Sequence, residues 1–245
     1  NGGTIQLNAQ GSGGAGSNIS GFAYTYSWTS VPAITPGIPN VANPVVNLTT
    51  PGTYTFTVTV NDGYSTANAS VNVTVHPLPQ VFSVTGGGEY CAQGVGLPIG
   101  LSGSQSGVNY QLFLGTNAVG PIVAGSVTGA ALDFGLQTAA GSYSVVATNA
   151  ATSCINTMGN PVSITINPLP VVNASATTPI AHGISTDLFG TATGGTGALS
   201  YAWTPSDKVA TGATALNAHT TNLYGNQVFT FTTTLGIRCR ESEYL

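Results

Sequence analysis

Apolar and polar residues alternate along most of this chain, and a period of two is the pattern of a β-strand with one buried face. The clearest case is the segment 54–60, Tyr-Thr-Phe-Thr-Val-Thr-Val, in which aromatic residues and valines alternate with threonines. The alternation resumes at Val71, Val73 and Val75, after the strong turn signal Asn-Asp-Gly at 61–63. No apolar stripe with helical spacing is sustained. The pattern therefore predicts an all-β protein built from β-sandwiches.

Two similar segments divide the chain. Val-Thr-Val-His-Pro-Leu-Pro at 73–79 recurs as Ile-Thr-Ile-Asn-Pro-Leu-Pro at 164–170. Proline fixes φ and donates no ladder hydrogen bond, so each Pro-Leu-Pro predicts the end of a strand and a short, stiff linker. The expected linker prolines are Pro77, Pro79, Pro168 and Pro170. The expected tandem modules are residues 1–76 (module one), 77–167 (module two) and 168–245 (module three).

A repeat of aromatic residues relates the two outer modules. Tyr-Ser-Trp-Thr at 26–29 corresponds to Tyr-Ala-Trp-Thr at 201–204, and Tyr-Thr-Phe-Thr at 54–57 corresponds to Phe-Thr-Phe-Thr at 229–232. Repetition at matching strand positions favours core packing over the alternative, sugar-stacking platforms on the two tryptophans. The expected core aromatics are Tyr26, Trp28, Tyr54, Phe56, Tyr201, Trp203, Phe229 and Phe231.

The low charge limits the partners of this protein. Of its 245 residues, three are Lys or Arg and seven are Asp or Glu. Nucleic acids and anionic membrane surfaces are bound through clustered Lys and Arg, so we expect neither as a partner. A run of about 18 apolar residues is also lacking, so we expect no membrane insertion in this segment. No signal peptide is visible at the start of the sequence.

The same scarcity of ionisable residues argues against catalysis, metals and cofactors. A glycosidase needs two opposed carboxylates, and calcium needs six to eight oxygen ligands, usually with several carboxylates. The seven acidic residues are scattered, and the three histidines have no metal-like spacing. Asp62 follows Asn61 in the turn at 61–63, and for it a turn-forming role is favoured over calcium binding. We expect no enzyme activity, no metal and no cofactor.

The quoted segments resemble two families. Modules one and three resemble PKD-type (polycystic kidney disease) domains, through the Tyr-x-Trp strand and the stretch PGTYTFTVTVNDG at 51–63. Module two resembles the Ig-like repeats of very large secreted Bacteroidetes surface proteins, through segments 90–113, 139–154 and 166–170. The resemblance implies tandem Ig-like and PKD-like sandwiches and a secreted or cell-surface location. It says little about activity, because such modules mostly serve as spacers, stalks or adhesive repeats.

The outer modules depart from the expected pattern at their ends. Module three has a lead-in segment, Val171 to Pro179, that module one lacks, so we expect the first strand of module one to be missing. Module three stops soon after Phe231 and ends in GIRCRESEYL, so we expect its last strand to be missing. Two interpretations remain. The chain is an excerpt of a longer polypeptide, or a strand from a neighbouring subunit completes an open module.

Module two contains two of the three cysteines, Cys91 and Cys154. Similar Ig-like repeats keep a cysteine at both places, so the resemblance implies a disulfide between them, with two buried thiols as the alternative. Such a bond stabilises a module by about 4 kcal/mol in the chain-entropy model. We expect Cys239 to be unpaired, or to pair outside this segment.

These observations lead to a function hypothesis. We expect a non-catalytic structural module of an extracellular fibre, stalk or surface adhesin. Its partners would be neighbouring modules or subunits, with strand complementation as one form of contact. The alternative is an adhesive or carbohydrate-binding segment of a larger secreted protein or enzyme, with an extracellular glycan as partner. That alternative requires exposed aromatic residues on a flat face or in a groove.

Overall fold

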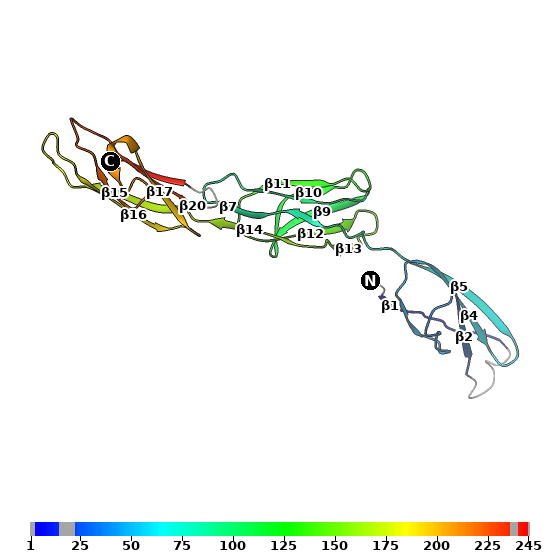
Figure 1. Ribbon diagram of the computed structural model, residues 1–245. Helices are drawn as coiled ribbons and strands as arrows, with labels where there is room; N and C mark the ends of the chain where they lie inside the picture. The colour runs from blue at the N-terminus through cyan, green and yellow to red at the C-terminus, as the bar shows by residue number, and fades with distance from the viewer. Residues whose placement is uncertain (1–2, 15–22, 236–239, 245) are drawn as a thin grey trace.

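The computed structural model describes residues 3–14, 23–235 and 240–244, and it shows an all-β protein of sandwich modules. The sandwiches follow one another end to end, and in Figure 1 module one is inclined to the line of the other two. No helix of the described residues is long and apolar enough to cross a membrane. The predicted fold class is confirmed.

Module one packs a two-stranded sheet, β1-β3, against a three-stranded sheet, β2-β4-β5. Its strands are β1 (Gly3–Gln6), β2 (Thr25–Val31), β3 (Val45–Leu48), β4 (Gly52–Asn61) and β5 (Thr66–Val75). The alternation in β4 places Tyr54, Phe56 and Val58 in the core, where they are 6%, 0% and 5% exposed. The intervening threonines face outward and pair across β5; Thr57, for example, hydrogen-bonds Ser70.

Module two is the largest sandwich. Its strands are β6 (Val84–Gly86), β7 (Gly88–Cys91), β8 (Leu97–Leu101), β9 (Val108–Leu114), β10 (Asn117–Ala124), β11 (Leu132–Gln137), β12 (Gly141–Asn149), β13 (Ile155–Thr157) and β14 (Val162–Asn167). One sheet has the order β11-β8-β6, and the other has the order β10-β9-β12-β14-β7 with β13 added to β12. Tyr110, Tyr143 and Val145 fill the space between the sheets.

Module three repeats the plan of module one. Its elements are β15 (Pro170–Ala176), β16 (Asp187–Gly194), β17 (Leu199–Thr204), the 3-10 helix η2 (Ser206–Lys208), β18 (Val209–Thr211), β19 (Asn217–Thr220), β20 (Thr230–Leu235) and β21 (Arg240–Tyr244). The sheets are β15-β16-β19-β18 and β17-β20-β21. Trp203 and Phe231 lie at the centre of the core, 1% and 0% exposed, with ring centroids 4.7 Å apart.

The ends of the two outer modules differ from expectation in one respect. The predicted absence of a last strand in module three was wrong, because β21 pairs with β20 from Thr234↔Arg240 to Thr230↔Tyr244. Its sequence RESEY lacks the expected alternation, but a strand needs backbone pairing rather than an apolar face. At the other end, β16 pairs with both β15 and β19, whereas the corresponding β1 pairs only with β3 among the described residues.

The two junctions between modules differ in their hydrogen bonds. Pro79 is buried and its carbonyl accepts a hydrogen bond from Asn156 Nδ2, at 2.8 Å. At the second junction lies Asn167, the last residue of module two, which is 5% exposed. Its Nδ2 donates to Glu89 of module two, and its Oδ1 accepts from the Thr196 hydroxyl of module three, 2.9 Å away. One side-chain hydrogen bond, from Thr196 to Asn167, thus joins modules two and three directly. Pro170, expected in the linker, instead is the first residue of β15.

We predict that Phe56→Ala destabilises module one by about 3–5 kcal/mol, because it leaves a cavity at the centre of that core. Differential scanning calorimetry of the full chain would show one transition moving to lower temperature while the others stay in place. Tyr64→Ala is the matched control: Tyr64 is 70% exposed, and a surface substitution of this kind changes stability by about 0.5 kcal/mol or less. Equal shifts for the two variants would contradict the assignment of Phe56 to the core.

Candidate functional site

The tryptophans lie in the cores. Trp28 is 8% exposed and its Nε1 donates to the carbonyl of Val41 at 2.9 Å, while Trp203 Nε1 donates to Ala215 at 3.1 Å. Tyr26 and Tyr201 are half-buried beside them, and Tyr201 stacks on Phe231 with ring centroids 5.9 Å apart. The two tryptophan rings are buried in the cores and are not exposed platforms for a ligand.

Asp62 shapes the turn at 61–63. The side chain is 5% exposed, and its Oδ1 accepts hydrogen bonds from the backbone amides of Tyr64 and Ser65, at 2.9 and 2.6 Å. This is the pattern of an Asx turn. Among the described residues, no group of three or more His, Cys, Asp or Glu side chains is placed to hold a metal ion. The geometry at Asp62 is that of a turn.

The predicted disulfide between Cys91 and Cys154 was wrong. Cys154 is a free, half-buried thiol, whereas Cys91 is disulfide-bonded. Along β12, Gly141 pairs with Ile164 and Thr148 pairs with Ile155. Cys91 lies beyond one end of this stretch, opposite Asn167, and Cys154 lies beyond the other. The stretch alone is about 23 Å long, and a disulfide requires Cα atoms within about 7 Å.

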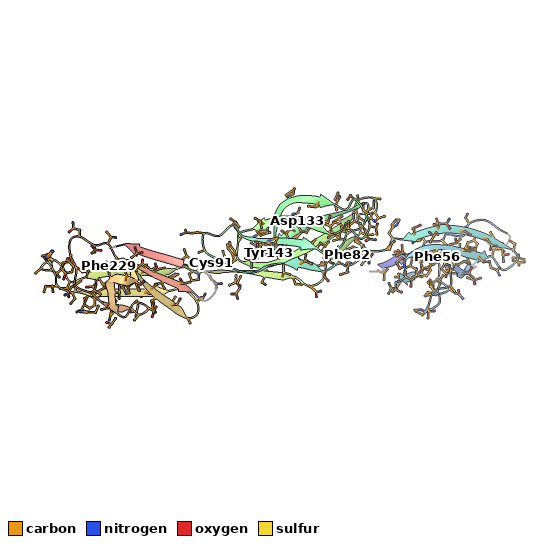
Figure 2. The ribbon with its side chains drawn as sticks, turned by 45° about the horizontal axis from the view of Figure 1, so that its top comes forward. Phe56, Phe82, Cys91, Asp133, Tyr143 and Phe229 are labelled. Carbon is orange, nitrogen blue, oxygen red and sulfur yellow. The ribbon has the colours of Figure 1, made fainter. Side chains whose placement is uncertain are left out.

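Cys91 occupies the end of module two that faces module three, as Figure 2 shows. The expectation for Cys239 lies outside the described residues.

Sequence reasoning missed a Ser-His-Asp arrangement on the outer face of module three. The register places His219 of β19 opposite Asp187 of β16, and Ser185 precedes Asp187 by two positions. His219 Nδ1 lies 2.6 Å from Asp187 Oδ1, and its Nε2 lies 3.0 Å from Ser185 Oγ. Because the contact depends on which residues face each other across two strands, only the pairing register reveals it.

The surroundings of this triad do not suit acyl transfer. The side chains of His219 and Asp187 are 46% and 58% exposed, so water surrounds them. Acyl transfer also needs backbone amides free to stabilise an oxyanion. The nearest amides are engaged: Thr186 N donates to Thr220 Oγ1 and Thr220 N donates to the Thr186 carbonyl, both at 2.9 Å. The arrangement is therefore interpreted as a cross-strand polar cluster.

An open groove of about 810 Å³ lies at the end of module three that is remote from module two. It is bordered by the end of β15, by the segment 177–186 and by the segment 221–229. Leu188, Leu223 and Phe229 form its floor and are 1%, 9% and 4% exposed. Asn226 and Gln227 stand exposed at its rim. A concave apolar floor with a few polar groups is the usual form of a ligand site.

The groove lies where module three lacks a tyrosine hydrogen bond that closes the end of the sandwich in the other two modules. Tyr54 donates to the carbonyl of Thr50 at 2.9 Å, and Tyr143 donates to that of Ala139 at 2.8 Å. Burial raises the pKa of Tyr143, so this hydroxyl stays protonated and donates at neutral pH. These bonds form the tyrosine corner of Ig-like sandwiches. Module three has Phe229 at the matching position, which has no hydroxyl, and a longer connection, 221–229 against 49–51 in module one.

Comparisons with known proteins identify the fold. Residues 3–75 match the family model K319L-like, PKD domain, which confirms the PKD-type resemblance of module one. A search of curated proteins found no match.

Among solved structures, the N-terminal eight Ig domains of Down Syndrome Cell Adhesion Molecule match with a TM-score of 0.56 and 16% identity, over 98% of this chain and 34% of that one. This chain thus spans about a third of that fragment. At this identity the likeness shows the fold: tandem Ig-like domains.

Two further structures match with lower scores. The I-band fragment I67–I69 of titin has a TM-score of 0.44 at 11% identity, over 100% of this chain and 91% of that chain. SGBP-B of the Bacteroides ovatus mixed-linkage glucan utilization locus, solved in complex with a mixed-linkage heptasaccharide, has a TM-score of 0.24 at 13% identity, over 98% of this chain and 62% of that chain.

We predict that iodoacetamide alkylates Cys154 but not Cys91 in the native, unreduced protein, because only the Cys154 thiol is free. Peptide mass spectrometry after digestion reads out both positions, and reduction beforehand exposes Cys91 as the internal control. Recovery of a Cys91–Cys154 cross-linked peptide would contradict the structure.

We predict that a fluorophosphonate probe does not label Ser185, because the adjacent amides of Thr186 and Thr220 are already hydrogen-bonded. The measurement is intact-mass analysis after incubation with the probe. Labelling that reaches Ser185 and disappears in His219→Ala would show an activated nucleophile and overturn the interpretation as a polar cluster.

Proposed function

We propose that this chain is a structural segment of an extracellular fibre, stalk or surface adhesin, in which three modules with the bounds 1–76, 77–167 and 168–245 act as a spacer. The observation that carries the proposal is the end-to-end arrangement of three sandwiches, each with its own core (Figures 1 and 2). A chain that only needed stability would gain by merging these cores, because buried surface increases with domain size. Separate cores in a row provide length instead.

The linkers support this role. Only residues 168 and 169 separate β14 from β15, and the hydrogen bond from the Thr196 hydroxyl to Asn167 holds module three on module two. The surface is almost free of charge, so copies lying side by side would not repel each other. These features suit a rod-shaped spacer rather than a catalytic domain.

Neighbouring modules or subunits are the proposed partners. In module three, β15 pairs with β16 and also contacts β20 and β21 of the facing sheet. In module one the matching edge of β1 has no described strand beside it, and Ile5, Val73 and Val75 at this side are only half-buried. We propose that a β-strand from neighbouring polypeptide adds to this edge by strand complementation.

A second candidate function is favoured by a specific observation, the groove of module three. An adhesive or carbohydrate-binding segment of a larger secreted protein needs a concave surface with an accessible aromatic ring. Tyr224 lies next to the groove and is 63% exposed.

Small-angle X-ray scattering tests the proposed spacer role through the radius of gyration. Strands of this length stacked as three modules give a rod on the order of 100 Å long and a radius of gyration of about 30 Å, whereas a compact globule of this size has about 18 Å. We expect the larger value, independent of protein concentration. Asn167→Ala should widen the distribution of distances by loosening the second junction, with exposed Asn117→Ala as the control. A radius of gyration near 18 Å would contradict the proposal.

A further inference from the structure

The lining of the groove in module three carries no formal charge. None of the residues around it is Asp, Glu, Lys or Arg, and its single titratable side chain is His182. The Asp187 carboxylate belongs to the opposite, outer face of β16, where it contacts His219. A phosphate, sulfate or carboxylate ligand would find no cation to pair with here, and burying an unpaired charge is costly. The groove therefore suits a neutral ligand.

The rim of the groove carries side-chain amides, and an aromatic ring lies beside it. Tyr224 does not line the groove, but it packs edge-to-face against His182, which does, with ring centroids 5.0 Å apart at 74°. Asn226 and Gln227, on the same segment, are both exposed. Each amide offers two donors and an acceptor. An aromatic ring supplies an apolar face and the amides match adjacent hydroxyl groups, which together are the features of a sugar ring.

The backbone at one border of the groove, between the segments 177–186 and 221–229, is already hydrogen-bonded and offers no open edge to an extended peptide. Peptides in grooves of β proteins are held by main-chain groups that the protein leaves open. Here the two bordering segments hydrogen-bond to each other: Gly183 N donates to the Leu223 carbonyl at 2.8 Å, and Leu223 N donates to the Ile184 carbonyl at 3.2 Å. The polar contacts that remain for a ligand at this border come from side chains.

We propose that the groove of module three binds a neutral oligosaccharide, with Tyr224 as the stacking ring and Asn226 and Gln227 as hydrogen-bonding groups. The inference rests on the adhesive or carbohydrate-binding candidate function and not on the spacer role. The floor of Leu188, Leu223 and Phe229 excludes water from one side of the bound sugar, which strengthens the hydrogen bonds on the other. Module one closes the matching corner with Tyr54, so the site is specific to module three.

The experiment uses the full chain and a set of neutral oligosaccharides, namely cellohexaose, maltohexaose, mannohexaose and a mixed-linkage gluco-oligosaccharide, with hexagalacturonate as the charged control. Binding is measured by isothermal titration calorimetry and by the side-chain amide signals of Asn226 and Gln227 in a ¹⁵N-¹H NMR titration. We expect at least one neutral oligosaccharide to bind and to shift both amide signals, and hexagalacturonate to leave them unchanged.

Variants locate the site. We expect Tyr224→Ala to weaken binding at least about tenfold, as for a central aromatic contact, and Asn226→Ala to weaken it less. Tyr64→Ala, an equally exposed tyrosine in module one, should leave binding unchanged. Circular dichroism melting confirms that each variant folds. The proposal is overturned if no neutral oligosaccharide binds at about 10 mM, if binding survives Tyr224→Ala, or if hexagalacturonate binds equally well. The radius of gyration of the same samples, from small-angle X-ray scattering, tests the spacer role independently of sugar binding.

Discussion

Each outer module depends on burying the aromatic face of a single central strand. In β4 the buried side chains are Tyr54, Phe56 and Val58, and in β20 they include Phe231, with Phe229 just before the strand. Charge contributes little to stability in a chain with so few ionisable residues. In module one the outward threonines of β4 instead hydrogen-bond to side chains of β5, so this face of the sheet stays hydrated without charge. Packing of the aromatic face therefore decides whether a module folds.

The same constraint explains where the modules can differ in sequence. Residues on the central strands must pack in the cores, whereas residues at the ends of the sandwiches are less restricted. Tyrosine hydroxyls close one corner in modules one and two, and Phe229 leaves that corner open in module three. The open corner and the longer segment 221–229 produce the groove. The loss of one tyrosine hydroxyl, next to a core that the modules share, thus makes the end of the sandwich a candidate binding surface.

Much of the fold could be predicted from the sequence because a period of two and the Pro-Leu-Pro segments are local signals. The alternation at 54–60 became β4, and both tryptophans lie in cores. Long-range features were less accessible. The Cys91–Cys154 disulfide was inferred from resemblance, but the pairing of β12 with β13 and β14 puts the two cysteines at opposite ends of a sheet.

The candidate sites depended on the same long-range information. Ser185, Asp187 and His219 meet only through the register of β16 and β19, and the groove requires two segments that are distant in sequence. β21 was missed because its residues do not alternate, although its backbone pairs with β20. Periodicity reports which face of a strand is buried, and it is silent on which strands meet.

The central claim is that three separately cored modules are joined in a row. Single-molecule force spectroscopy of the full chain tests it most directly, since a stretched chain extends by about 3.5 Å per residue released. The account predicts three successive unfolding events, each releasing the length of one module. A single event that releases the whole chain would show one cooperative core and would contradict the account.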